Sequence, residues 1–169
     1  MNMYTAYDLT VPVFTKSLGG LRQVLEKAIA FGLTDEFLSA SLADDMFPFV
    51  KQVQIACDNA KGAAGRLAQV EVPVFADTEA TLGDLVMRID ATIAFLETLT
   101  PEQFTDVDAV SVTLPYFPGT YMEGSEYLLQ FALPNFFFHV AQAYALVRRA
   151  GVPIGKSDYL NGIPLRPLE

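Results

Sequence analysis

The sequence predicts an all-α protein, a single domain built as a four-helix bundle. Four long segments carry apolar residues at every third or fourth position, the pattern of a helix with one buried face. Apolar residues make up 51% of the 169-residue chain and charged residues only 18%, a balance that suits a well-filled core. The alternation of apolar and polar residues that is typical of a strand is confined to one short region. Helices packed around one core therefore account for most of the chain.

The first helix is expected over residues 11–31. Its buried stripe consists of Phe14, Leu18, Leu21, Leu25 and Ala28. Thr10 can cap the start, Pro12 is tolerated in a first turn, and Gly32 is suited to end the helix. The pair Gly19–Gly20 weakens the middle by up to about 1 kcal/mol per glycine relative to alanine. We therefore expect these glycines to allow a neighbouring helix to approach closely.

The second helix is expected to begin with Asp44 or Asp45 as its cap, to carry Pro48 in its first turn and to end near Leu67. Its buried stripe consists of Met46, Val50, Val53, Cys57, Ala60, Ala64 and Leu67. The side chains of this stripe become smaller toward the end of the helix, so another helix can approach closely there. Cys57 lies on the stripe and is interpreted as a small buried apolar residue rather than a nucleophile.

The third helix begins where Thr81 and Asp84 have the spacing of a capping box, and it ends near Thr100. Its apolar residues are Leu82, Leu85, Ile89, Ile93 and Leu96. The fourth helix is expected from Ser125 to about Ala150, because a glycine and a proline follow it closely.

The connections between the helices differ in kind. Residues 33–43 resemble a short helical turn, whereas residues 68–80 form a longer link with alternating valines. In residues 109–123 apolar and polar residues alternate on both sides of a stretch that contains proline and glycine. This pattern predicts two short strands joined by a turn, a small β-hairpin before the fourth helix. The proline-rich tail, 152–169, is expected to pack on the bundle, so that residues 1–169 form one domain.

Charge and composition exclude several classes of partner. The net charge of −9 argues against nucleic acid and anionic membranes, since both favour clustered lysine and arginine. A single cysteine excludes an intramolecular disulfide and a cysteine-built zinc site. No uninterrupted apolar run reaches the roughly 18 residues of a membrane span, and no secretory signal is evident. We therefore expect a cytoplasmic protein.

The fourth helix carries the only histidine, His139, four residues after Asn135. Both residues fall on the core-facing stripe of this helix. Pro134 has no N–H, and its ring excludes the carbonyl of Gln130, so we expect the helix to be distorted just before them. A buried polar group without a partner costs about 1–3 kcal/mol. These two side chains must therefore be paired within the protein, with water or with a ligand.

Two interpretations of this polar pair remain open. In the first, Asn135 and His139 satisfy each other, the freed carbonyl and polar residues of the second helix. In the second, they line a small polar pocket that binds a small molecule. The candidate ligand-binding residues are His139, Asn135, Gln54, Asp58 and Gln52. Gln52 and Asn59 lie further from the buried stripe, so we expect them to be more exposed than Gln54 and Asp58. No catalytic residue and no cofactor is predicted.

Two segments carry a family resemblance, DMFPFVKQVQIACDNAKG (45–62) and LPNFFFHVAQAYALVRRAGVPIGKSDYL (133–160). From Tyr7 to about Gly162 the chain resembles an uncharacterised domain-of-unknown-function family of the DinB/YfiT-like superfamily. The resemblance implies an up-down-down-up four-helix bundle with a long link between the second and third helices. Many DinB-like proteins bind a divalent metal through three histidines, some are thiol-dependent transferases, and many are dimers. A homodimer is therefore expected.

The metal pattern of the superfamily is incomplete in this sequence. His139 matches the second histidine of the pair on the last helix, and Asn135 stands where the first would be. Gln52 or Gln54 stands in place of the histidine on the second helix. We therefore predict no metal site. A small-molecule-binding bundle is the favoured function, and the alternatives are a divergent metal-dependent transferase or hydrolase and a structural homodimer without a ligand. Whether the protein is an enzyme stays open.

Overall fold

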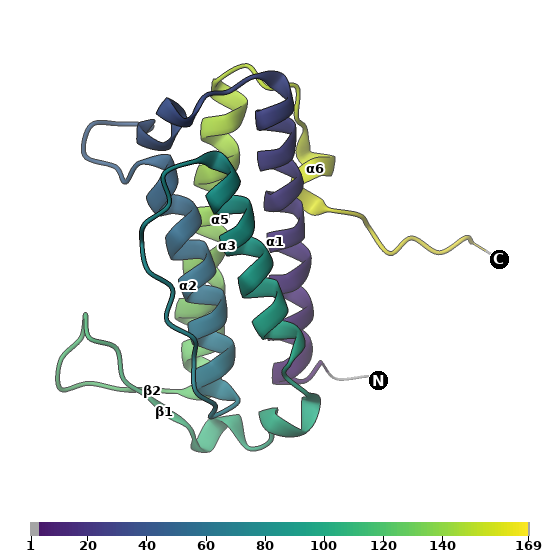
Figure 1. Cartoon of the computed structure of the whole chain (residues 1–169). Helices are drawn as coiled ribbons and strands as arrows, with labels where there is room; N and C mark the ends of the chain where they lie inside the picture. The colour runs from purple at the N-terminus through teal and green to yellow at the C-terminus, as the bar shows by residue number, and fades with distance from the viewer. Residues whose placement is uncertain (1–3, 169) are drawn as a thin grey trace.

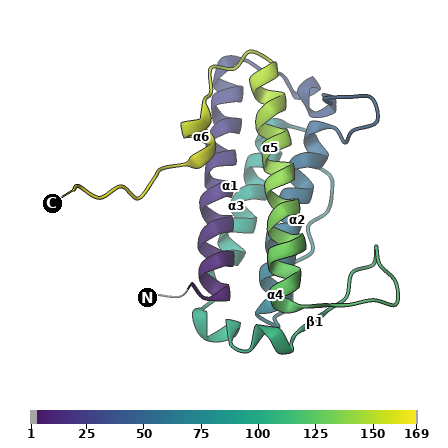
Figure 2. The same ribbon diagram turned by 180° about the vertical axis from the view of Figure 1, so that it is seen from behind.

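The computed structural model describes residues 4–168, and its four long helices run side by side (Figure 1). They are α1 (Ala6–Phe31), α2 (Phe49–Leu67), α3 (Leu82–Glu97) and α5 (Leu133–Arg149). Helix α1 rises, α2 and α3 both descend, and α5 rises again, as the views from the two sides agree (Figures 1 and 2). The link between α2 and α3 returns along the length of the bundle. The predicted up-down-down-up order and long link are therefore confirmed.

Short elements join and cover the helices. They are η1 (Asp35–Ser39), η2 (Pro101–Phe104), η3 (Val107–Ala109), β1 (Ser111–Val112), β2 (Met122–Glu123), α4 (Gly124–Glu126), η4 (Tyr127–Ala132) and α6 (Lys156–Leu160). The predicted hairpin is present, with β1 antiparallel to β2. Helix α6 in the tail packs against α1, where a Cβ at Gly20 would lie 3.0 Å from the carbonyl oxygens of Asp158 and Tyr159. Gly20 therefore permits a close approach, as expected.

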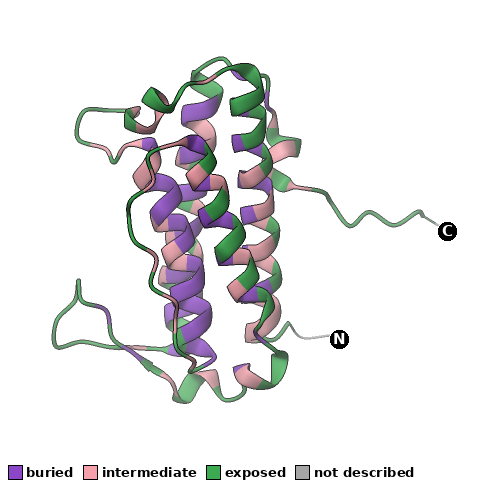
Figure 3. Ribbon diagram, in the orientation of Figure 1, coloured by how far each residue is buried: buried purple, intermediate pink, exposed green. Residues whose placement is uncertain are grey.

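Helix α2 is the most enclosed of the four long helices. It packs against α3 and α5, while α1 also contacts α3 and α5 and so closes the bundle. Of its 19 residues, 13 are buried, as its predominantly purple ribbon indicates (Figure 3). Alanines and glycines in its second half let the neighbouring elements approach closely. Polar side chains on α2 must therefore find partners inside the protein.

Helix α1 begins earlier than the sequence analysis predicted. Thr5 is its cap, with the N–H of Asp8 donating to Thr5 Oγ1 at 3.2 Å and the N–H of Thr5 donating to Asp8 Oδ2 at 2.9 Å. This complete capping box satisfies the first amides, so the helix starts at Ala6. The predicted cap, Thr10, is buried inside the helix and donates to the carbonyl of Ala6, and Pro12 lies beyond the first turn.

Helix α2, by contrast, starts later than predicted, at Phe49. Pro48 is its N-cap in an extended conformation, so Asp44 and Asp45 lie in the preceding turn and do not cap it.

The predicted capping box of α3 is confirmed, because the N–H of Asp84 donates to Thr81 Oγ1 at 3.0 Å. Within residues 4–168, none of the helices combines the length and the apolar character that crossing a bilayer requires.

The fourth predicted helix is continuous but irregular. It comprises α4, η4 and α5, and η4 is a π-helix in which the N–H of Leu133 donates to the carbonyl of Leu128, five residues earlier. Pro134 follows immediately and cannot donate to Gln130. Wider turns before the proline keep its ring away from that carbonyl. The distortion predicted before Asn135 is present and takes the form of a π-helix.

Candidate functional site

His139 forms a buried pair with Gln52 across the α2–α5 interface. The Nδ1 of His139 lies 2.7 Å from the Oε1 of Gln52, and the Nε2 of Gln52 donates to the carbonyl of Phe47 at 2.9 Å. Burial lowers the pKa of the His139 imidazole, so the ring is neutral at pH 7. Because the Gln52 oxygen can only accept, Nδ1 carries the proton and donates. Gln52 is therefore the α2 amide that faces the histidine.

Gln54 and Asp58 face the opposite way, toward the link between α2 and α3. The Nε2 of Gln54 donates to Glu79 Oε2 at 2.6 Å. Asp58 Oδ1 accepts from Arg88 at 2.9 Å and lies 3.0 Å from the Nζ of Lys61. Two separate polar groups therefore flank α2, one toward α5 and one toward the link.

Arg88 is the centre of the group on the side of the link. Its side chain is 2% exposed and pairs with Glu79 at 2.7 Å, with Asp58 at 2.9 Å and with Asp77 at 3.0 Å. Burial acts to raise the pKa of the Glu79 carboxyl, but hydrogen bonds from Arg88 and Gln54 outweigh it and hold that pKa below its usual value. A hydrogen bond from Lys51 likewise lowers the pKa of the Asp77 carboxyl, so Glu79 and Asp77 are both charged at pH 7. This cluster attaches the link to α2 and α3.

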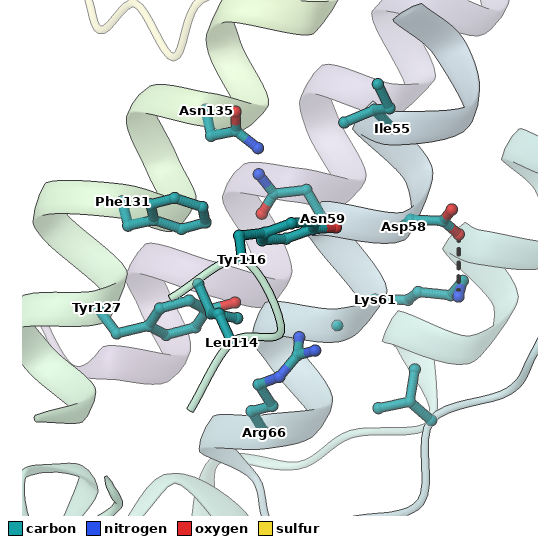
Figure 4. Close-up of a pocket in the computed structure, with 12 residues that line it drawn as sticks. Ile55, Asp58, Asn59, Lys61, Arg66, Leu114, Tyr116, Tyr127, Phe131 and Asn135 are labelled. Atoms are coloured by element: carbon teal, nitrogen blue, oxygen red, sulfur yellow. Dashed lines mark ion pairs between the residues drawn. The ribbon is translucent and has the colours of Figure 1, made fainter. Parts of the chain in front are cut away.

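A cavity of about 350 Å³ opens beside α2, between the polar groups (Figure 4). Its lining residues are Ile55, Asp58, Asn59, Lys61, Gly62, Arg66, Val72, Leu114, Tyr116, Tyr127, Phe131 and Asn135. The side-chain nitrogen and oxygen of Asn59 are both buried and have no hydrogen-bond partner among residues 4–168. In Figure 4 the amides of Asn59 and Asn135 point toward each other across the space between α2 and α5. Asn59 therefore lines the cavity and carries a buried amide without a partner in the described chain.

The predicted site residues divide between this cavity and its surroundings. Asn135 and Asp58 line the cavity, whereas His139, Gln52 and Gln54 are outside its lining. His139 hydrogen-bonds to Gln52, and no hydrogen bond joins it to Asn135 within the described chain. The interpretation in which a polar residue of the second helix satisfies His139 therefore holds for Gln52, but the mutual pairing of Asn135 and His139 does not occur.

Asn59 was missed as a candidate because its residue is partly exposed while its amide is buried, and the predicted exposure of Gln52 is wrong. Gln52 is 2% exposed, and the polar atoms of Asn59 are buried. One buried face was expected for α2, but the helix is covered on several sides. The spacing of Ile55, Asn59, Gly62 and Arg66 could have indicated a second inward stripe.

The donor set does not fit the metal site of the superfamily. Among residues 4–168 no three histidine, cysteine, aspartate or glutamate side chains are grouped so that they could hold a metal ion. The amides of Asn135 and Gln52 are poor substitutes for imidazoles, and one nitrogen of His139 already donates to Gln52. Cys57 is fully buried, and burial raises the pKa of its thiol to about 12, so it is a packing residue as predicted.

The fold defines a class, the DinB-like helical bundles. A crystal structure of a DinB family member protein from Shewanella denitrificans is similar, with a TM-score of 0.90 and 38% sequence identity over 96% of this chain and 95% of that one. Residues 6–160 match the family described as Domain of unknown function (DUF1993), and the chain belongs to that family. The comparison with curated proteins found no match.

Replacement of His139 by leucine tests the buried pair. The variant leaves the Gln52 oxygen without its donor, so we expect the free energy of unfolding at pH 7 to fall by about 1–3 kcal/mol in urea titrations. In the natural chain the unfolded state binds a proton below about pH 6.5 that the folded state does not bind, because burial lowers the pKa of His139. Its stability should therefore decrease from pH 6.5 toward 5, and His139→Leu should abolish that decrease.

The matched control is the double variant Gln52→Met, His139→Leu. It removes both partners and should recover much of the lost stability, since replacing a whole hydrogen-bonded pair by apolar groups is far less costly than removing one member. A His139→Leu protein as stable as the natural chain at pH 7, with the same pH profile, would contradict the buried pair.

Proposed function

We propose that this protein binds a small organic molecule in the cavity between α2 and α5. The buried amide of Asn59, without a partner among residues 4–168, is the observation that carries the proposal. An unsatisfied buried polar group costs about 1–3 kcal/mol, and a ligand that offers both a donor and an acceptor recovers that cost. Asn135 lies opposite and provides a second amide for the same ligand (Figure 4).

The walls of the cavity support this function. Its volume of about 350 Å³ falls in the range of roughly 300–1,000 Å³ found for small-molecule sites. Tyr116, Tyr127 and Phe131 offer aromatic surface, and the two amides supply a few polar contacts, the usual composition of such a site. Tyr127 and Phe131 come from the π-helix η4, a kind of element that is frequent at functional sites.

The other predicted ligand residues take supporting roles in this proposal. His139 and Gln52 connect α5 to α2 one turn beyond Asn135 and so fix the width of the cavity. Gln54 holds Glu79, which in turn binds Arg88, and Arg88 fixes Asp58 in the cavity wall. A divergent metal-dependent enzyme of the transferase or hydrolase type is less well supported, because His139 is the only imidazole available.

Native mass spectrometry of untagged protein, together with metal analysis, tests the proposal. We expect a non-covalent small-molecule adduct, either retained through purification or acquired from a library of small organic molecules, and no stoichiometric metal. Asn59→Leu should lose the adduct because it removes the unpaired amide. Gln130→Leu is the matched control, since Gln130 is an exposed amide outside the cavity lining, and it should keep the adduct. Stoichiometric zinc or nickel, or no adduct with any compound, would contradict the proposal.

A homodimer is a second proposal, and exposed apolar side chains along the segment η4–α5 favour it. Leu129 in η4 is 54% exposed and Phe138 in α5 is 51% exposed. Exposed apolar surface is a common feature of protein–protein contacts. In the dimer these side chains would be covered by the second copy, and the cavity would function independently in each copy.

Sedimentation velocity at micromolar concentration measures the assembly state. We expect a dimer for the natural chain and a monomer for Phe138→Ser, because the serine removes apolar surface from the contact. Leu165→Ser changes an 84% exposed residue in the tail and should leave the dimer intact. A natural chain that stays monomeric at this concentration would remove the homodimer proposal without affecting the cavity.

A further inference from the structure

We infer that the ligand of the cavity is an organic anion, a carboxylate, and that Arg66 binds its negative charge. The inference rests on the proposed function and adds the chemical class of the ligand. Arg66 lies in the last turn of α2, is exposed, and lines the cavity. It forms no ion pair with an acidic side chain within residues 4–168, which distinguishes it from the other cations around the cavity.

The remaining charges near the cavity are balanced by one another. The carboxylates are Asp58, Asp77 and Glu79, and the cations paired with them are Lys51, Lys61 and Arg88. The Lys61 ammonium also lies over the ring of Phe75, 5.0 Å from its centroid, and its side chain is only 9% exposed. These three cations are therefore committed to the protein, and Arg66 contributes the positive charge left for a ligand.

The backbone beside Arg66 makes room for its guanidinium. A Cβ at Gly62 would lie 2.6 Å from Nη1 of Arg66, so the side chain folds back over this glycine, one turn earlier on α2. Figure 4 shows the guanidinium directed from α2 toward the other lining residues. A guanidinium offers a planar pair of N–H donors that matches a carboxylate, and this geometry favours a carboxylate over a neutral group.

A second donor lies close to Arg66. Tyr127 is 2% exposed, and burial raises the pKa of its hydroxyl, while the neighbouring charge of Arg66 only partly opposes this. The hydroxyl therefore stays protonated at pH 7 and can donate a hydrogen bond to a carboxylate oxygen held by Arg66. Leu114 and Phe131 supply apolar surface for the body of the ligand.

The amides lie at the other end of the cavity. Seven residues separate Asn59 from Arg66 on α2, which corresponds to about 10 Å along the helix axis. Figure 4 likewise shows Asn135 and Arg66 at opposite ends of the labelled group. A ligand that meets both ends carries a carboxylate at one end, a flat apolar body and a neutral polar group at the other. A hydroxyl-substituted aromatic acid has this form.

Calorimetric titration of the full chain with 4-hydroxybenzoate and with 4-hydroxybenzamide tests the inference. The two probes differ only in the charge of one group, a carboxylate in the acid and a neutral amide in the other. We expect the acid to bind at least about tenfold more tightly, because a hydrogen bond to a charged group contributes at least about that factor in affinity. Arg66→Gln should remove this preference, and Arg66→Lys should keep part of it. Arg166→Gln is the matched control, because it removes the same charge from an exposed position in the tail.

The possible outcomes separate this inference from the proposed function. Equal binding of the two probes, or a preference that survives in Arg66→Gln, overturns the assignment of a carboxylate while the cavity remains a binding site. The assignment is also overturned if neither probe binds but a compound without a carboxylate gives an adduct that Asn59→Leu loses. If neither probe binds and no adduct forms with any compound, the proposed function fails and the inference fails with it.

Discussion

A buried polar group needs a partner, and in this bundle that requirement falls mainly on α2. The helix is enclosed by α3, by α5 and by the link that runs along the bundle, so side chains on several of its faces lose contact with water. Gln52 finds a partner in His139, Gln54 in Glu79, and Lys61 in Asp58. The first two contacts also fix a neighbouring segment in place, α5 through His139 and the link through Glu79. The polar residues of α2 therefore position α5 and the link rather than merely being accommodated by them.

The same requirement distinguishes the cavity from the rest of the interior. Where α5 or the link supplies a partner, the space beside α2 is closed. Between those two contacts the π-helix and the loop after β1 line a cavity, and the amide of Asn59 has no partner among residues 4–168. By the resemblance to DinB-like proteins, Asn135 and either Gln52 or Gln54 stand where histidines are expected, and Gln52 is the one that contacts His139. We propose that recognition of an organic molecule by amides takes the place of metal coordination in this bundle.

Most of the fold could be predicted from the sequence, because each long helix has a clear apolar stripe and the box of Thr81 and Asp84 marks a start. The cap at Thr10 was wrong because Thr5 and Asp8 satisfy the first amides five residues earlier. The inward direction of His139 was predicted, but its partner was not. Gln52 and Gln54 are two residues apart, and only the packing of α2 between α5 and the link decides which of them meets the imidazole.

Asn59 was missed because one buried face was assumed for α2, whereas the helix is buried on several sides. The free energy of unfolding of ligand-free Asn59→Leu protein tests most directly whether this amide is kept for a ligand. If it is, leucine removes an unsatisfied polar group, and stability should be unchanged or higher by about 1 kcal/mol or more. A loss of more than about 2 kcal/mol would mean that Asn59 is satisfied within the folded protein, and would contradict a role in ligand binding.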